Sequence, residues 1–119
     1  MPTIMIVEDY PVTQRVLGTT LRNEGFAVVI AANGLEALER LETTQIDLAL
    51  VDIAMPEMDG LTLLQHLRSD PRYLQLPVVM LTASGQDEDR AQALSLGASG
   101  FLTKPASSQE LLGTVRQFV

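Results

Sequence analysis

Five side chains that could act together on a phosphate group follow short apolar segments of the chain: Glu8 and Asp9, Asp52, Thr82, and Lys104. Three carboxylates brought close together repel one another unless a cation neutralises them. Ligand sets made only of oxygen select a hard cation, Mg²⁺ or alternatively Mn²⁺. A carboxylate can also attack phosphorus to form an acyl phosphate, and an ammonium and a hydroxyl could neutralise and hydrogen-bond the phosphoryl oxygens. The set therefore predicts metal-assisted phosphoryl transfer.

The elements that must position these residues alternate along the chain. Short runs rich in Val, Ile and Leu predict buried strands, and the stretches between them have the apolar spacing of amphipathic helices. The predicted strands cover residues 4–7, 27–30, 48–51, 78–81 and 100–102, and the predicted helices cover 11–22, 35–42, 61–68, 88–96 and 110–119. We expect the first helix to present Val12, Val16, Leu17 and Leu21 on one side, and the fourth to present Ala91, Leu94 and Leu96.

Start and stop signals support these boundaries. A cap residue followed by Glu three positions later has the spacing of a capping box, and a glycine just past a helix end suits a left-handed cap. The chain has both signals, at Asn33 with Glu36, Ser107 with Glu110, Gly25 and Gly97. The pattern predicts an α/β fold of (βα)₅ type. Its doubly wound, parallel, five-stranded sheet has helices on both faces and the flavodoxin-like strand order 2-1-3-4-5.

Composition limits the possible functions. The chain has 119 residues, the size of one domain, no cysteine and a formal net charge of −7. We therefore expect one domain over 1–119, no disulfide or thiolate metal site, and no basic surface for direct nucleic-acid binding. The apolar runs are too short for a membrane span and no signal peptide shows at the N-terminus, so we expect a cytoplasmic protein with no membrane partner.

In an open α/β sheet the binding site lies beyond the carboxyl ends of the strands, where the strand order reverses. There the segments at 6–9, 51–60, 81–83 and 104–105 resemble the signature segments of response-regulator receiver domains, the CheY-like domains of two-component signalling. The four segments occur in the family's order, each at a predicted strand end. The resemblance covers essentially the whole chain.

The resemblance implies a role for each matching residue. Asp52 would be the phosphoacceptor, and Lys104 would pair with it or with its phosphate. Glu8, Asp9, Asp52 and the backbone carbonyl of Ala54 would hold Mg²⁺. Thr82 would move toward the phosphate, and Phe101 would turn inward when it does. The Lys104–Pro105 peptide bond would be cis.

The implied function is a phosphorelay switch rather than an enzyme with external turnover. The domain would catalyse only its own phosphorylation and autodephosphorylation. A sensor histidine kinase or a histidine phosphotransfer protein would donate the phosphoryl group. A downstream protein partner would bind the face formed by 88–96, 100–102 and 110–119.

Three other functions stay open at this stage. A flavin-binding electron carrier would need a first loop rich in Ser, Thr and Gly to cradle a phosphate, whereas this loop begins with Glu8 and Asp9. A phosphatase with an aspartyl nucleophile would need a second acid soon after Asp52, where Ile53 and Ala54 stand instead. A receiver-like module that only binds proteins, without phosphorylation, would normally have lost one of the site residues.

Overall fold

The structure, a computed structural model, describes residues 1–55, 58–82 and 87–119, with the backbone alone at 87–89. Pro56, Glu57 and Ala83, which belong to the segments compared above, lie outside the described residues. Eleven elements follow in chain order: β1 (Thr3–Val7), α1 (Pro11–Asn23), β2 (Ala27–Ala31), α2 (Gly34–Thr43), β3 (Leu48–Asp52), α3 (Gly60–Ser69), the short 3₁₀ helix η1 (Pro71–Tyr73), β4 (Val78–Thr82), α4 (Asp87–Ser95), β5 (Gly100–Thr103) and α5 (Ser108–Phe118).

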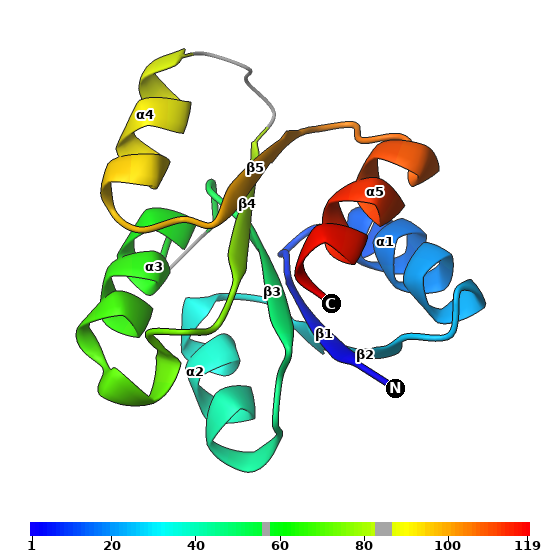
Figure 1. The fold of residues 1–119 in the computed structure, drawn as a ribbon, viewed down its shortest axis with the longest axis horizontal. Helices are drawn as coiled ribbons and strands as arrows, with labels where there is room; N and C mark the ends of the chain where they lie inside the picture. Colours follow the sequence, from blue (N-terminus) through cyan, green and yellow to red (C-terminus); the bar gives the residue numbers. More distant parts are fainter. Residues whose placement is uncertain (56–57, 83–86) are drawn as a thin grey trace.

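The sheet has the predicted topology. Five parallel strands lie in the order β2-β1-β3-β4-β5, with α1 and α5 on one face and α2, α3 and α4 on the other (Figure 1). The α/β flavodoxin-like fold predicted from the apolar pattern is therefore confirmed. The pattern did not predict η1, which a Pro71 turn and the Asp70 cap form between α3 and β4.

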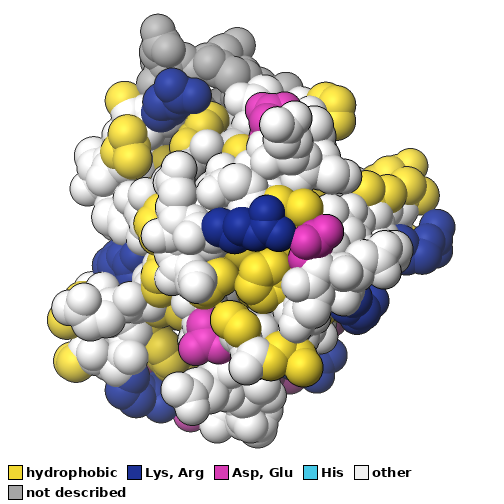
Figure 2. All heavy atoms as spheres, turned by 45° about the vertical axis from the view of Figure 1, so that its right-hand side comes forward, with side chains coloured by type: hydrophobic (Ala, Val, Ile, Leu, Met, Phe, Trp, Pro, Cys, Tyr) yellow, Lys and Arg dark blue, Asp and Glu magenta, His cyan; other side chains and the backbone are white. Residues whose placement is uncertain are grey.

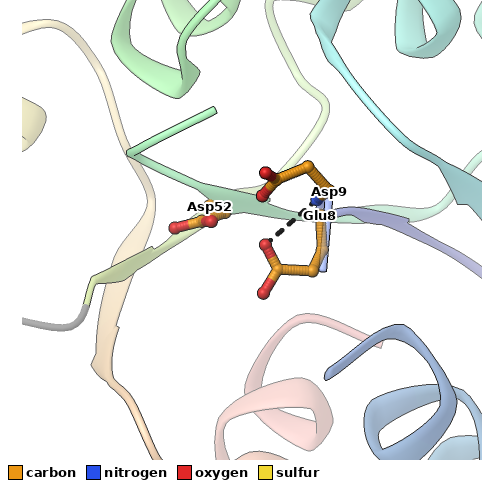
Figure 3. A group of neighbouring side chains, drawn as sticks. All are labelled: Glu8, Asp9 and Asp52. Carbon is orange, nitrogen blue, oxygen red and sulfur yellow. Dashed lines mark hydrogen bonds between the residues drawn. The ribbon is translucent and has the colours of Figure 1, made fainter. Parts of the chain in front are cut away.

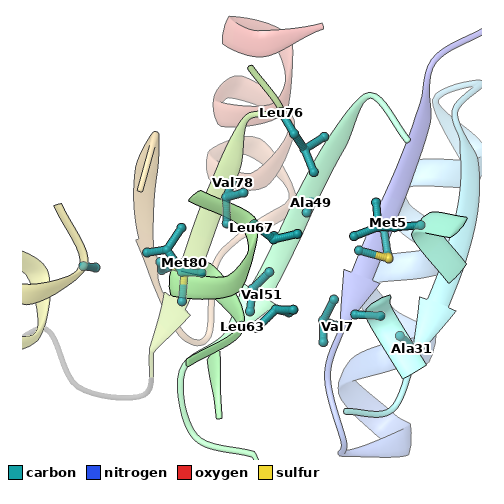
Figure 4. Close-up of a cluster of buried hydrophobic side chains, with 14 residues drawn as sticks. Met5, Val7, Ala31, Ala49, Val51, Leu63, Leu67, Leu76, Val78 and Met80 are labelled. Carbon is teal, nitrogen blue, oxygen red and sulfur yellow. The ribbon is translucent and has the colours of Figure 1, made fainter. Parts of the chain in front are cut away.

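Each face of the sheet has its own hydrophobic core, because successive side chains of a strand point to opposite faces. On β1, Met5 and Val7 join the cluster under α2, α3 and α4 (Figure 4), whereas Ile4 and Ile6 join the cluster under α1 and α5. All four are fully buried. Burial of an aliphatic side chain of this size contributes about 1.5 to 3 kcal/mol, so the two clusters supply the main force that holds the layers together.

The structure confirms most of the helix caps that the sequence predicted. Ser107 and Glu110 form a complete capping box at the start of α5. At the start of α2, Asn33 accepts a hydrogen bond from the Glu36 amide, but the Glu36 carboxylate turns to the amide of Ala32, so only half of the box forms. Gly25 and Gly97 have φ of 92° and 102°, the left-handed conformation expected of glycines after α1 and α4.

Two predicted apolar helix faces differ from the structure. On α1, Leu17 and Leu21 are buried, but Val12 and Val16 are 46% and 58% exposed. They line a cavity of about 400 Å³ between α1 and the segment after β5, which explains apolar side chains outside the core. Over residues 90–95 of α4, Ala93 is buried whereas Leu94 is exposed, because a short helix over an edge strand turns only a narrow stripe toward the sheet.

The face formed by α1 and α5 carries side chains of both charges (Figure 2). On the face formed by α1 and α5, basic side chains are spaced apart and do not gather into a patch (Figure 2). No helix in the described part of the chain has both the length and the apolar character needed to cross a bilayer.

Candidate functional site

The predicted site residues meet at the carboxyl edge of the sheet. Glu8 directly follows β1, Asp52 ends β3 and Thr82 ends β4. The register places Val7 beside Val51, and Asp52 beside Leu81, so these strand ends are level with one another. Residues more than seventy positions apart in the sequence are thus neighbours because β1, β3 and β4 are adjacent strands.

Three carboxylates form the centre of this edge (Figure 3). One oxygen from each of Glu8, Asp9 and Asp52 lies within 4.8 Å of the others. Glu8 is fully buried and Asp52 is 5% exposed, whereas Asp9 is exposed. The Asp9 amide donates a hydrogen bond of 3.2 Å to Glu8 Oε2, which folds the two consecutive acidic residues together. The cluster is therefore anchored in the protein on one side and open to water on the other.

Lys104 supplies the positive charge that two of these carboxylates need. Its Nζ lies 2.8 Å from Glu8 Oε1 and 3.3 Å from Asp52 Oδ2. Burial alone would lower the pKa of Lys104, but the hydrogen bond to Glu8 and the charges of Asp52 and Glu8 outweigh it and hold the pKa above its ordinary 10.5. Lys104 therefore stays charged at neutral pH and bridges the ends of β1 and β3.

Glu8 is the acid most disturbed by this environment. Burial is the main cause that raises the pKa of Glu8 above its ordinary 4.5, and the neighbouring Asp52 adds to it, while Lys104 opposes the shift. The ionised form of Glu8 therefore depends on a nearby cation. For this reason we expect a second cation to bind at the cluster and to stabilise its carboxylates in the ionised form.

The donor set fits a hard divalent cation. It consists of carboxylate oxygens, partly buried and partly open to water, and Mg²⁺ prefers a few carboxylates together with several waters. Ala54 lies exposed two residues after Asp52, and its amide donates a long hydrogen bond of 3.4 Å to Asp52 Oδ1. This contact holds the backbone after β3 close to the cluster, where its carbonyl is the predicted fourth ligand.

The remaining predicted residues lie on β4, on β5 and just after it. Thr82 is 5% exposed, and its carbonyl accepts a hydrogen bond of 2.6 Å from the Lys104 amide. Phe101 is half-buried on β5 beside Met80, and it packs against the cluster under α2, α3 and α4. The Lys104–Pro105 peptide bond is cis. The structure thus brings the whole predicted set to one edge, with Phe101 set back along β5.

A family comparison identifies this arrangement. A model described as the response regulator receiver domain matches residues 4–116. The chain belongs to this family. It is a receiver domain of the two-component response regulators, as the signature segments indicated.

Individual relatives agree. This receiver domain is 42% identical over 115 residues to an uncharacterized 14.6 kDa protein of Leptolyngbya boryana, covering 97% of this chain and 88% of that one. It is 38% identical over 116 residues to the DNA-binding dual master transcriptional regulator RpaA of a Synechocystis strain, covering 98% of this chain and 48% of RpaA. The chain spans about half the length of several such regulators.

The fold is shared with solved receiver structures. The chemotaxis protein CheY4 of Vibrio cholerae superimposes with a TM-score of 0.95 at 29% identity, covering 100% of this chain and 99% of that one. The match extends over both layers of helices, so the strand order and the placement of the carboxyl edge are those of the family.

Two contacts near the receiver site were not predicted. Gln14, in the first turn of α1, donates a hydrogen bond of 2.6 Å from Nε2 to the backbone carbonyl of Glu8 and so ties the start of α1 to the acidic loop. Gly60 lies against β3, where an added Cβ would clash with the Asp52 carbonyl oxygen. Nothing in the sequence analysis indicated the close approach at Gly60 or the contact of Gln14.

Proposed function

We propose that this receiver domain is a phosphorylation switch in which Asp52 accepts a phosphoryl group from a phosphohistidine. The observation that carries the proposal is the convergence of the Glu8 and Asp9 carboxylates and the Lys104 ammonium on Asp52 at the carboxyl edge of the sheet. An Asp52 carboxylate oxygen would attack phosphorus, and the P–N bond to the donor imidazole would break. The imidazole would leave with the bonding electron pair and take up a proton.

Each neighbour has a role in this transfer. Glu8, Asp9, Asp52 and the Ala54 carbonyl would hold Mg²⁺, which supplies charge neutralisation for the phosphoryl oxygens. Lys104 would pair with the Asp52 carboxylate before the transfer and with its phosphate afterwards. These roles agree with the general requirement of phosphoryl transfer for positioning and charge neutralisation, with little covalent work by the protein.

The output would be a change in a binding surface. Thr82 would donate a hydrogen bond to the phosphate, and Phe101 would reorient as Thr82 moves. These steps would alter the face formed by α4, β5 and α5, where a downstream partner would bind. The acyl phosphate would later be hydrolysed at the same site, so the domain acts as a switch that modifies itself, without turnover of an external substrate.

Family membership supports a proposal for the biological setting. A histidine kinase or a histidine phosphotransfer protein would be the donor, in the cytoplasm. Residues 1–119 would act as one receiver domain. The output of any larger regulator that contains it would be set by that protein's other segments, as in the relatives of twice this length.

Intact-mass measurement with a small phosphodonor tests the transfer. The protein is incubated with phosphoramidate and MgCl₂, with and without EDTA. We expect a gain of one phosphoryl group that requires Mg²⁺, is lost in Asp52→Asn and reacts with hydroxylamine as an acyl phosphate does. Asp59→Asn is the matched control, because Asp59 caps α3 nearby and Asn also caps helices.

The outcomes separate the alternatives. Phosphorylation of Asp59→Asn but not of Asp52→Asn supports the proposal. Equal phosphorylation of the wild type and Asp52→Asn would place the acceptor elsewhere. No mass gain in a folded protein that binds Mg²⁺ would favour a module that works by protein binding alone.

A further inference from the structure

A positively charged side chain lies over the aromatic ring of β5. The guanidinium carbon of Arg90 is 5.2 Å from the centroid of the Phe101 ring. Arg90 is exposed in the first half of α4, and Phe101 is the second residue of β5. A guanidinium within about 6 Å of a ring centroid is attracted by the negative face of the π system. The contact therefore links α4 to β5 through two side chains.

The residues that the structure describes enclose the Phe101 ring only in part. The ring is only half-buried, because β5 lies at the edge of the sheet. Leu102 is the one buried residue of β5. The apolar side of Phe101 packs against the cluster that contains Met80 and Ala93. Its position thus depends on partial burial on one side and on the Arg90 guanidinium on the other.

Phe101 is also close in register to the phosphorylation site. Thr82 lies beside Thr103, two residues along β5 from Phe101. A displacement of Thr82 toward Asp52 would act on β5 at this point, while Arg90 acts on Phe101 from α4. The position of the Phe101 ring therefore depends both on Thr82 at the site and on Arg90 on α4.

We propose that Arg90 is a positioning residue that stabilises Phe101 in the arrangement described here and so opposes the switch. This inference rests on the proposed function. Cation–π contacts at exposed positions are worth about a two- to fivefold change in an equilibrium constant. A ligand that favours the switched arrangement must overcome this bias, so loss of Arg90 increases its apparent affinity by the same factor.

The first measurement tests the contact itself, without any phosphoryl analogue. In NMR spectra of the unmodified protein, the side-chain protons of Arg90 are expected to be shifted upfield by the Phe101 ring current. The shift is expected to disappear in Phe101→Leu. Arg90 shifts that are the same in the wild type and in Phe101→Leu would show that the contact does not exist in solution and would overturn the proposal.

The second measurement tests the bias. Beryllium fluoride with MgCl₂, an analogue of the phosphoryl group, is titrated into the wild type and Arg90→Ala, with the Phe101 ring signals as the readout. We expect binding about two- to fivefold tighter in Arg90→Ala. Arg40→Ala is the matched control: Arg40 is an exposed arginine on α2, so this variant loses the same charge far from β5.

A double-mutant cycle assigns the effect to the ring. We expect Arg90→Ala to have no effect on beryllium fluoride binding in a Phe101→Leu background, where binding is followed by the amide signals around Asp52. The same effect in both backgrounds, or equal effects of Arg90→Ala and Arg40→Ala, would attribute the change to net charge and overturn the proposal. Failure of every variant, wild type included, to bind the analogue would instead remove the proposed function on which the inference rests.

Discussion

Lys104 bridges two carboxylates that have little contact with water, so its removal should expose the electrostatic cost of the site. Glu8 is fully buried and the Asp52 side chain is 7% exposed, while the Lys104 side chain is 24% exposed. Removing one partner of a buried ion pair costs about 3 to 5 kcal/mol. Because water reaches a quarter of the Lys104 side chain and screens its charge, we expect Lys104→Met to lower the free energy of unfolding by about 2 to 3 kcal/mol.

The loss should depend on pH and on Mg²⁺. Burial raises the pKa of Glu8, so the folded protein keeps the Glu8 proton over a pH range above 4.5 where the unfolded chain has released it. Stability therefore falls as the pH rises through that range, and Lys104 matters most above it. At about pH 5 the cost of Lys104→Met should shrink, because Glu8 can take up a proton. Saturating Mg²⁺ should also reduce the cost, because the bound ion replaces the missing charge and stabilises the folded state by mass action.

Urea unfolding followed by circular dichroism measures these differences in EDTA and in MgCl₂. Arg116→Met is the matched control, because Arg116 forms an exposed ion pair with Glu24, with side chains 58% and 41% exposed. Such pairs contribute about 0 to 1 kcal/mol, with no reason for a Mg²⁺ dependence. The reasoning is refuted if Lys104→Met costs no more than Arg116→Met in EDTA, or if its cost is the same with and without Mg²⁺.

Two further predictions concern single contacts. Gly60→Ala should lower the free energy of unfolding by about 1 to 3 kcal/mol or more, because its Cβ would meet the Asp52 carbonyl. Gly113→Ala in α5, with open space around it, should raise the free energy of unfolding by about 0.5 to 1 kcal/mol. Urea unfolding compares the two variants, and equal effects would contradict the close approach at Gly60. Arg72→Ala should raise the lowered pKa of Glu42 back toward 4.5, because the hydrogen bond from Arg72 is the main cause of the shift. A carboxyl NMR titration in which the pKa of Glu42 does not change would show that the ion pair is not maintained in solution.

The order of elements was predictable because the strands are apolar on both faces and the intervening helices are periodic. Burial within the helices was harder to predict. Val12 and Val16 have the spacing of core residues, but their neighbours belong to α1 and to the segment after β5, more than eighty residues away. On α4, Ala93 is buried and the larger Leu94 is exposed, because burial depends on the angle of the helix over β5 and not on side-chain size.

The types of residue at the site were also predictable, since chemistry restricts what can follow each strand. The ion pairs that Lys104 forms were not predictable. The sequence placed Lys104 near Asp52, but it did not indicate that the shorter contact of Lys104 would be with Glu8. A Glu side chain reaches one methylene further than Asp, and whether that extra length points toward Lys104 is fixed only by the packing of β1 between β2 and β3.

The strand order also determines when, during synthesis, the proposed site first becomes complete. The carboxyl edge is completed by Lys104, which follows the last strand of the sheet. During synthesis from the N-terminus, the acidic residues of β1 and β3 emerge well before their counter-charge, and β4 has no partner on its outer side until β5 arrives. A nascent chain that ends before β5 therefore carries Asp52 without Lys104 beside it. Under the proposed function, competence for phosphorylation would arise only after β5 has joined the sheet and Lys104 has followed it.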